Sequence, residues 1–141
     1  ANRGWYYDPH FAKKIGDKPI SNFTKRKTMV DAKHFEPIIS GMWNVVNANA
    51  GTARKAEIAG IDVCGKTGTV QNPHGKDHSV FIAFAPMDNP KIAIAVIVEN
   101  AGYGGTWAAP IASLMIEKYL LKEFKSMAKE SRILNAILVE P

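Results

Sequence analysis

One stretch of the sequence is rich in residue types that bind anions, Cys64-Gly65-Lys66-Thr67-Gly68-Thr69. Together with Gly60 it satisfies G-x-x-x-x-G-K-[ST], the pattern of a phosphate-binding loop. That loop needs an apolar strand before its first glycine and a helix that begins at the lysine. Here Arg54-Lys55-Ala56-Glu57 precedes it, and Gly68, Gln71-Asn72-Pro73 and Gly75 prevent a helix of any length. A P-loop NTPase is kept only as an alternative, which predicts nucleotide binding that Lys66→Ala abolishes.

The same residues fit the K-T-G element of penicillin-binding proteins and serine β-lactamases, which lies on a strand lining an active-site cleft. In such a strand, Gly65 and Gly68 leave room for a peptide substrate to approach the backbone. Lys66 brings positive charge toward a substrate carboxylate. Thr67 and Thr69 offer hydroxyl donors to the same anion. The alternative without a functional role is an ordinary glycine-containing strand with one exposed lysine.

The motifs around this strand resemble class B penicillin-binding proteins, most closely the elongation-type members often called penicillin-binding protein 2. The resemblance covers roughly residues 1–122 and is carried by Gly51-Thr52-Ala53, Gly65 to Gln71, Asp77-His78-Ser79, Phe84-Ala85-Pro86, Glu99-Asn100 and Ala109-Pro110-Ile111. It implies a partial serine β-lactamase/transpeptidase-like fold. It also implies that the parent protein cross-links peptidoglycan stem peptides ending in D-Ala-D-Ala through a serine acyl-enzyme, and that β-lactams inhibit it.

The resemblance further implies roles for the residues of the motif. Lys66, Thr67, Gly68 and Thr69 would bind the substrate, with Lys66, Thr67 and Thr69 on its terminal carboxylate. The backbone N–H of Thr69 would form one half of the oxyanion hole, so that Lys66 and Thr69 are the catalytic candidates. For the parent, the family implies the periplasmic face of the inner membrane, an N-terminal anchor absent here, and the cell-elongation machinery as partner.

The sequence departs from the family in its other two motifs. No S-x-N occurs, and the single S-x-x-K, Ser126-Met127-Ala128-Lys129, lies downstream of K-T-G in a charged tail, where we interpret it as a coincidence. The chain is therefore expected to begin after both motifs and to supply no nucleophile. Alone it should show no turnover and no covalent penicillin adduct. The alternative is a non-catalytic sheet domain that binds a peptide or a partner.

Other candidates give no second site. His74 and His78 have a spacing that would suit a metal on a helix, but Asn72-Pro73 and Gly75 predict a loop, and no metal or cofactor is expected. Cys64 is interpreted as a small strand residue rather than a nucleophile. The formal charge of +5 is concentrated in a basic stretch without interleaved aromatics, so we expect no nucleic-acid partner.

The pattern of apolar residues predicts the elements that position the motif. Apolar residues recur at helical spacing from Phe35 to Val46 and from about Trp107 to Phe124. Strands are expected over Ile61–Gln71, Ser79–Ala85 and Lys91–Val98, after an exposed two-stranded ribbon in the first thirty residues. The last strand is expected to be central and buried on both faces, with a helix against its alanine side.

These elements predict an α+β fold, an antiparallel sheet with packed helices. Residues 1–125 should form the C-terminal part of a transpeptidase domain, and residues 126–141 a tail. Because part of the sheet should lack its cover, the isolated chain is expected to self-associate.

Overall fold

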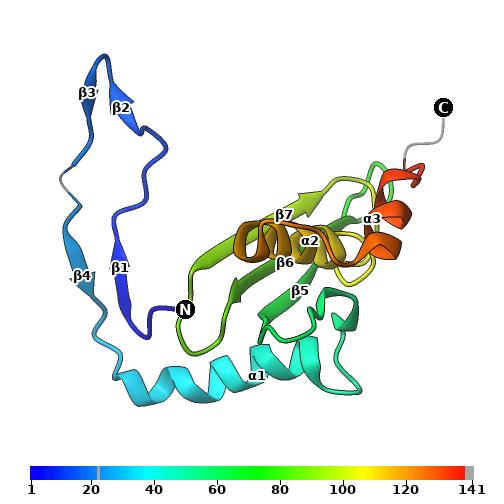
Figure 1. Cartoon of the computed structure of the whole chain (residues 1–141), viewed down its shortest axis with the longest axis horizontal. Helices are drawn as coiled ribbons and strands as arrows, with labels where there is room; N and C mark the ends of the chain where they lie inside the picture. The colour runs from blue at the N-terminus through cyan, green and yellow to red at the C-terminus, as the bar shows by residue number, and fades with distance from the viewer. Residues whose placement is uncertain (22, 139–141) are drawn as a thin grey trace. The chain divides into compact units, whose positions relative to one another are not determined.

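A computed structural model describes residues 1–21 and 23–138 of the chain (Figure 1). The chain divides into two compact units, one of residues 2–38 and one that contains residue 1 and residues 39–141. Within the described residues, no helix combines the length and the apolar character that a membrane crossing requires.

The first unit is a narrow antiparallel ribbon, blue in Figure 1. Its strand β1 (Trp5–Tyr7) pairs with β4 (Lys25–Lys27), and β2 (Lys14–Ile15) pairs with β3 (Lys18–Pro19). Every residue of these strands is exposed. The predicted exposed ribbon is therefore confirmed, and it is held by backbone pairing and surface contacts rather than by a core.

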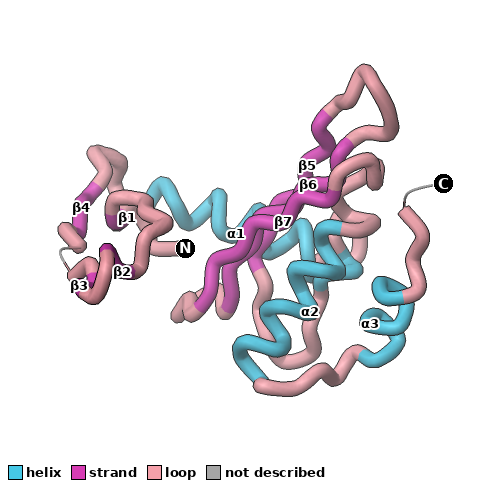
Figure 2. Tube along the Cα trace, turned by 90° about the horizontal axis from the view of Figure 1, so that it is seen from above, coloured by secondary structure: helices cyan, strands magenta, loops and turns pink. Residues whose placement is uncertain are grey.

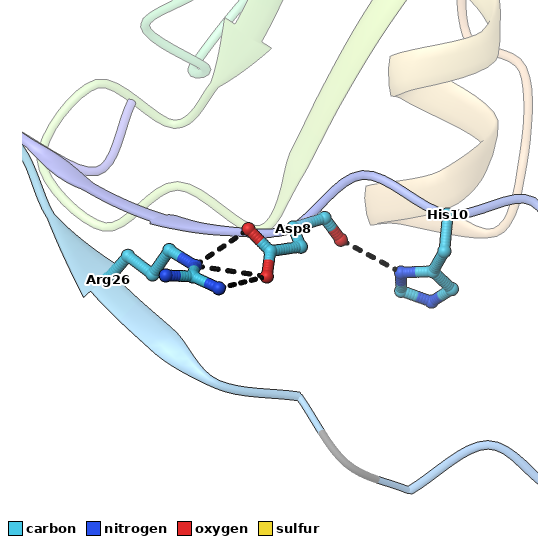
Figure 3. Close-up of polar contacts among 3 residues, drawn as sticks. All are labelled: Asp8, His10 and Arg26. Atoms are coloured by element: carbon cyan, nitrogen blue, oxygen red, sulfur yellow. Dashed lines mark hydrogen bonds and ion pairs between the residues drawn. The ribbon is translucent and has the colours of Figure 1, made fainter.

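An ion pair joins the two long sides of the ribbon (Figure 3). Arg26 Nε donates to Asp8 Oδ1 at 2.7 Å, and Arg26 Nη2 donates to Asp8 Oδ2 at 2.8 Å. These hydrogen bonds lower the pKa of the Asp8 carboxyl. Because both side chains are exposed to water, the pair adds little stability and serves mainly to fix how the two sides face each other.

The first long helix, α1 (Phe35–Asn47), follows the short 3-10 helix η1 (Ala32–His34) and confirms the helix predicted from Phe35. Val46, near its C-terminal end, is fully buried. At the last residue, Asn47 Nδ2 donates to the Val63 carbonyl at 2.9 Å. The end of α1 is therefore tied directly to the residue that precedes the motif strand.

The second unit is built on a three-stranded antiparallel sheet. Its strands are β5 (Cys64–Val70), β6 (His78–Ala85) and β7 (Ile92–Val98), in the order β5-β6-β7. The helix α2 (Ala108–Leu121) packs along one face of β6 and β7 (Figure 2). The three predicted strands, the second helix and the α+β class are confirmed.

The core lies between α2 and this face of the sheet. Phe81 of β6 and Ile116 of α2 are fully buried in it, and the 3-10 helix η2 (Arg54–Ala56) closes one side through Ala56. On β7, the side chains packed against this core are Ile92, Ile94, Val96 and Val98. The expected packing of a helix against the alanine side of the strand is therefore wrong. The close approach comes from the helix instead, which turns three alanines to the sheet, Ala108, Ala109 and Ala112.

The expectation that the last strand is central and buried on both faces is also wrong. β6 is the central strand of the described sheet, and β7 lies at its edge. On the outer face of β7, Ala93 and Ala95 are exposed, and Ile97 retains 62% of its accessible surface. A run of apolar residues shows that each side chain can be buried. It does not show which strands pair with that run or what covers its two faces.

The last described helix is α3 (Met127–Leu134), which packs against α2. Ser126 precedes it, and its backbone N–H donates to the buried carboxylate of Glu117 at 3.4 Å. The tail therefore contains a regular helix that is anchored to α2.

Candidate functional site

The motif strand β5 lies at one edge of the sheet and carries its candidate residues on two faces. Thr67 lies opposite the buried Phe81, whereas Lys66 lies opposite Ile82, which is half exposed. Because side chains alternate along a strand, Thr69 shares the face of Thr67. The structure therefore separates the predicted carboxylate-binding set into two hydroxyls on one side of the strand and one cation on the other.

A groove lies on the hydroxyl side of β5, and we call it the threonine groove. Three chain segments form it: the turn after α1, the strand β5, and the loop before α2. Its lining residues are Gly51, Thr52, Arg54, Lys55, Thr67, Thr69, Tyr103, Gly104, Gly105 and Thr106. Both threonines of the motif thus face an open space large enough for a small ligand.

The loop before α2 is held against β5 by close backbone contacts. A Cβ on Gly104 would overlap the carbonyl oxygen of Val80 and lie 2.5 Å from that of Gly68. Ser79 ties the two ends of the loop together, because its hydroxyl donates to the Tyr103 carbonyl at 2.9 Å and accepts from the Ala108 N–H at 3.0 Å. Since Ser79 is fully buried, this anchor is shielded from water.

Two polar contacts meet at the middle of the motif. The hydroxyl oxygens of Thr52 and Thr67 lie 3.2 Å apart. On the other face, Lys66 Nζ donates to the backbone carbonyl of Thr67 at 2.7 Å. The ammonium group of Lys66 is therefore folded back along the strand, close to the residue whose hydroxyl faces the groove.

The groove also has a cationic side. Arg54 is fixed there, because it donates to the Asn47 carbonyl at 2.7 Å and pairs with Glu57 at 2.8 Å. Lys55 is exposed beside it. Hydroxyl donors with cations nearby suit an anionic group such as a carboxylate, because hydrogen bonds to an ionised acceptor are the stronger ones. The arrangement can bind an anion, and the lining contains no imidazole or carboxylate that could act as a general base.

The two glycines of the motif differ in how much space their surroundings leave for a side chain. A Cβ on Gly65 would fall on the ring of Phe81, so this glycine is needed for core packing rather than for the access of a substrate that we expected. At Gly68 the nearest side-chain atom, Val80 Cβ, would be 3.4 Å away, which is ordinary contact. The backbone of Gly68 is instead approached by Gly104, where an added Cβ would lie 2.5 Å from the Gly68 carbonyl oxygen.

The structure contradicts the phosphate-loop alternative. Lys66 and Thr67 lie in the middle of β5, whereas a phosphate-binding loop needs them at the start of a helix. Cys64 is fully buried at the first position of the strand, as its interpretation as a small strand residue predicts. His78 Nδ1 accepts from the Asn100 N–H at 3.0 Å, so this imidazole holds the turn after β7.

The downstream S-x-x-K sequence is not arranged as a nucleophile and its base. Lys129 Nζ donates to the hydroxyl of Ser113 at 2.8 Å and to the Glu57 carbonyl at 3.1 Å. The Ser126 hydroxyl donates instead to Glu117 at 3.4 Å. Burial lowers the pKa of Lys129, against the opposing effect of the two nearby carboxylates. Lys129 therefore anchors α3 to α2 and to the segment before β5.

Comparison with known proteins decides the family. The family described as "Penicillin binding protein transpeptidase domain" matches residues 1–117. The chain belongs to this family. It is 36% identical to the peptidoglycan D,D-transpeptidase MrdA of Haemophilus influenzae over 91% of the chain and 23% of that protein. It is 31% identical to the peptidoglycan D,D-transpeptidase PbpA of Mycolicibacterium smegmatis over 82% of the chain and 26% of that protein.

Solved structures of penicillin-binding proteins share the fold. Pseudomonas aeruginosa PBP2 in complex with WCK 5153 superposes with a TM-score of 0.71 at 38% identity, over 86% of the chain and 28% of that protein. The ceftriaxone acyl-enzyme complex of penicillin-binding protein A from M. tuberculosis gives 0.69 at 29% identity, over 84% and 29%. The chain spans about a quarter of the length of the curated relatives cited here.

Sequence reasoning missed part of the threonine groove. It placed Lys66 to Thr69 on a strand, but it did not assign a role to Thr52 or to the loop of Tyr103–Thr106. Gly51-Thr52-Ala53 was noted only as part of the family resemblance. A pair of glycines shortly before a helix, Gly104-Gly105, was the available signal that a backbone passes close to another chain segment.

Proposed function

We propose that this chain forms one wall of the active site of a peptidoglycan D,D-transpeptidase, which cross-links stem peptides ending in D-Ala-D-Ala and is a target of β-lactams. The observation that carries the proposal is the edge strand β5, with the hydroxyls of Thr67 and Thr69 on a groove and Lys66 on its other face. An extended peptide can align along such an edge while its terminal carboxylate meets hydroxyls and positive charge.

In the proposed reaction, a serine oxygen attacks the carbonyl of the penultimate D-alanine. The bond to the terminal D-alanine breaks, and that residue leaves with a proton on its new amine. An acceptor amine then attacks the acyl-serine ester, a new peptide bond forms, and the serine regains its proton. The N–H of Thr69 supplies one oxyanion-hole donor, a group whose loss costs about 10²–10³ in rate in other acyl-transfer enzymes.

The attacking serine is assigned to a part of the parent protein outside these residues. In the only S-x-x-K sequence of the chain, the Ser126 hydroxyl donates to Glu117, and Lys129 Nζ donates to the Ser113 hydroxyl. These separate partners support the assignment. The proposal places the parent at the periplasmic face of the inner membrane, anchored outside this segment, with the cell-elongation machinery as partner. It also assigns residues 1–125 to the transpeptidase domain and residues 126–141 to a tail, which the family match to residue 117 supports.

Acylation by a fluorescent penicillin tests the proposal in the full-length protein. We expect wild type to be labelled, and Thr67→Val or Thr69→Val to slow labelling by about 10- to 100-fold, the worth of a hydrogen bond to a charged group. Thr24→Val is the matched control, because it removes an exposed hydroxyl from the ribbon. The proposal would be contradicted if penicillin did not label the wild-type parent protein. It would also be contradicted if Thr67→Val and Thr69→Val were both labelled at the wild-type rate.

The isolated chain gives a complementary test. After incubation with penicillin its intact mass should not change, because the nucleophile is assigned elsewhere. It should also self-associate through the outer face of the sheet, where Ile82 and Ile97 are 48% and 62% exposed. A covalent adduct would refute the assignment of the serine, and a strictly monomeric chain in sedimentation would refute the self-association.

A further inference from the structure

The turn after α1 places a hydroxyl next to the motif strand with little freedom to move. Gly51 passes so close to the C-terminal end of α1 that an added Cβ would lie 2.7 Å from the Asn44 carbonyl oxygen. Ala53 is fully buried, and its N–H donates to the Val45 carbonyl at 2.9 Å. The residue between them, Thr52, is therefore fixed on both sides by its neighbours.

A third contact fixes Thr52 from the opposite direction. The loop before α2 crosses its backbone at Gly105, where an added Cβ would overlap the Thr52 carbonyl oxygen. The side chain of Thr52 is left exposed in the threonine groove, with its hydroxyl oxygen 3.2 Å from that of Thr67. Backbone packing on three sides thus serves to hold one hydroxyl against another.

The direction of this hydrogen bond determines what Thr67 can do. A hydroxyl has one hydrogen to donate and can accept two hydrogen bonds. If Thr67 donates to Thr52, its hydrogen is used and it has none for a ligand carboxylate. If Thr52 donates to Thr67, the hydrogen of Thr67 is free to point into the groove, and the chain of two hydroxyls strengthens that donor.

We propose that Thr52 is a positioning residue that donates its hydroxyl hydrogen to Thr67 and so directs the Thr67 hydroxyl toward a ligand carboxylate in the threonine groove. Thr52 does not contact the ligand in this arrangement and acts only through Thr67. The inference rests on the proposed function, since it concerns the same carboxylate.

Penicillin acylation of the full-length protein separates this role from a structural one. Thr52→Val keeps the shape and removes the donor. We expect it to raise the penicillin concentration for half-maximal acylation rate by roughly 2- to 10-fold, the worth of one neutral hydrogen bond. The acylation rate at saturation should stay near that of wild type. Thr52→Ser should restore most of the affinity, and a penicillin ester, which has no carboxylate, should not distinguish Thr52→Val from wild type.

A double-mutant cycle supplies the decisive result. In the Thr67→Val background the hydroxyl that Thr52 directs is missing, so Thr52→Val should have no further effect. An equal loss in both backgrounds, or an unchanged affinity of Thr52→Val in a protein that penicillin acylates, would overturn the inference alone. A wild-type protein that penicillin does not acylate would overturn the proposed function and this inference with it.

Discussion

Replacing Gly104 by alanine should both destabilise the second unit and displace the motif strand. The new methyl group would overlap the Val80 carbonyl oxygen and lie 2.5 Å from the Gly68 carbonyl oxygen, so the loop must move by roughly 1 Å to restore normal contact. The atoms in the way are backbone atoms of β5 and β6, which cannot rotate aside as a side chain can. Overpacking costs about 1–3 kcal/mol, and this site belongs at the upper end.

The movement should also weaken the start of α2, because the Ala109 N–H donates to the Gly104 carbonyl at 2.9 Å. At about 3 kcal/mol, and a few degrees per kcal/mol for a chain of this size, the melting temperature should fall by about 10 °C. Gly41→Ala in α1 is the control, since its Cβ meets nothing within 4 Å and a helical glycine costs up to about 1 kcal/mol relative to alanine. We expect a small rise in stability there. A Gly104→Ala variant that melts within 1 °C of wild type would refute the packing argument.

Three further outcomes follow from buried and paired groups. Phe81→Ala should cost about 3–5 kcal/mol in urea unfolding, because the ring is fully buried; a loss below about 1 kcal/mol would contradict its central place. Lys129→Met should cost about 1–2 kcal/mol through its two lost hydrogen bonds, measured in the same way. Because burial lowers the pKa of Lys129 below 10.5, wild-type stability should rise with pH between the lowered pKa and 10.5, and Lys129→Met should lack that rise. Asp8→Asn should remove the small stabilisation that Arg26 gives the ribbon above the ordinary Asp pKa of 3.8. Amide exchange in β1 should then increase slightly, and unchanged exchange would show that the pair does not act there.

The sequence was sufficient to predict the helices around the motif because they have a clear period, and the strands because they have clear boundaries. α1 and α2 repeat their apolar residues at helical spacing, and β5 to β7 are short runs bounded by turn residues. Burial on the two faces of β7 was not predictable in the same way. Its alanines and isoleucines tolerate burial on either side, and only the pairing of the strands determines which side is covered.

The same limit applied within the site. Lys66 to Thr69 are adjacent in sequence, so their chemistry could be predicted together, but Thr52 reaches them from fifteen residues upstream through a packed turn. The need for a glycine at position 65 was visible, while its reason was not. Contact with Phe81 depends on the register between β5 and β6, which a list of residue types does not contain.

The division of the motif between two faces of an edge strand limits where an anion can sit. A ligand deep in the threonine groove could meet Thr67 and Thr69, but Lys66 would stay on the far side of the sheet. A ligand over the outer face could meet Lys66 alone. Only at the edge of β5 that no described strand pairs with can hydroxyls from one face and the ammonium group from the other approach the same carboxylate. If the three groups bind one carboxylate as proposed, β5 must therefore lie at an edge of the sheet, because a partner strand beside it would occupy the position of that carboxylate.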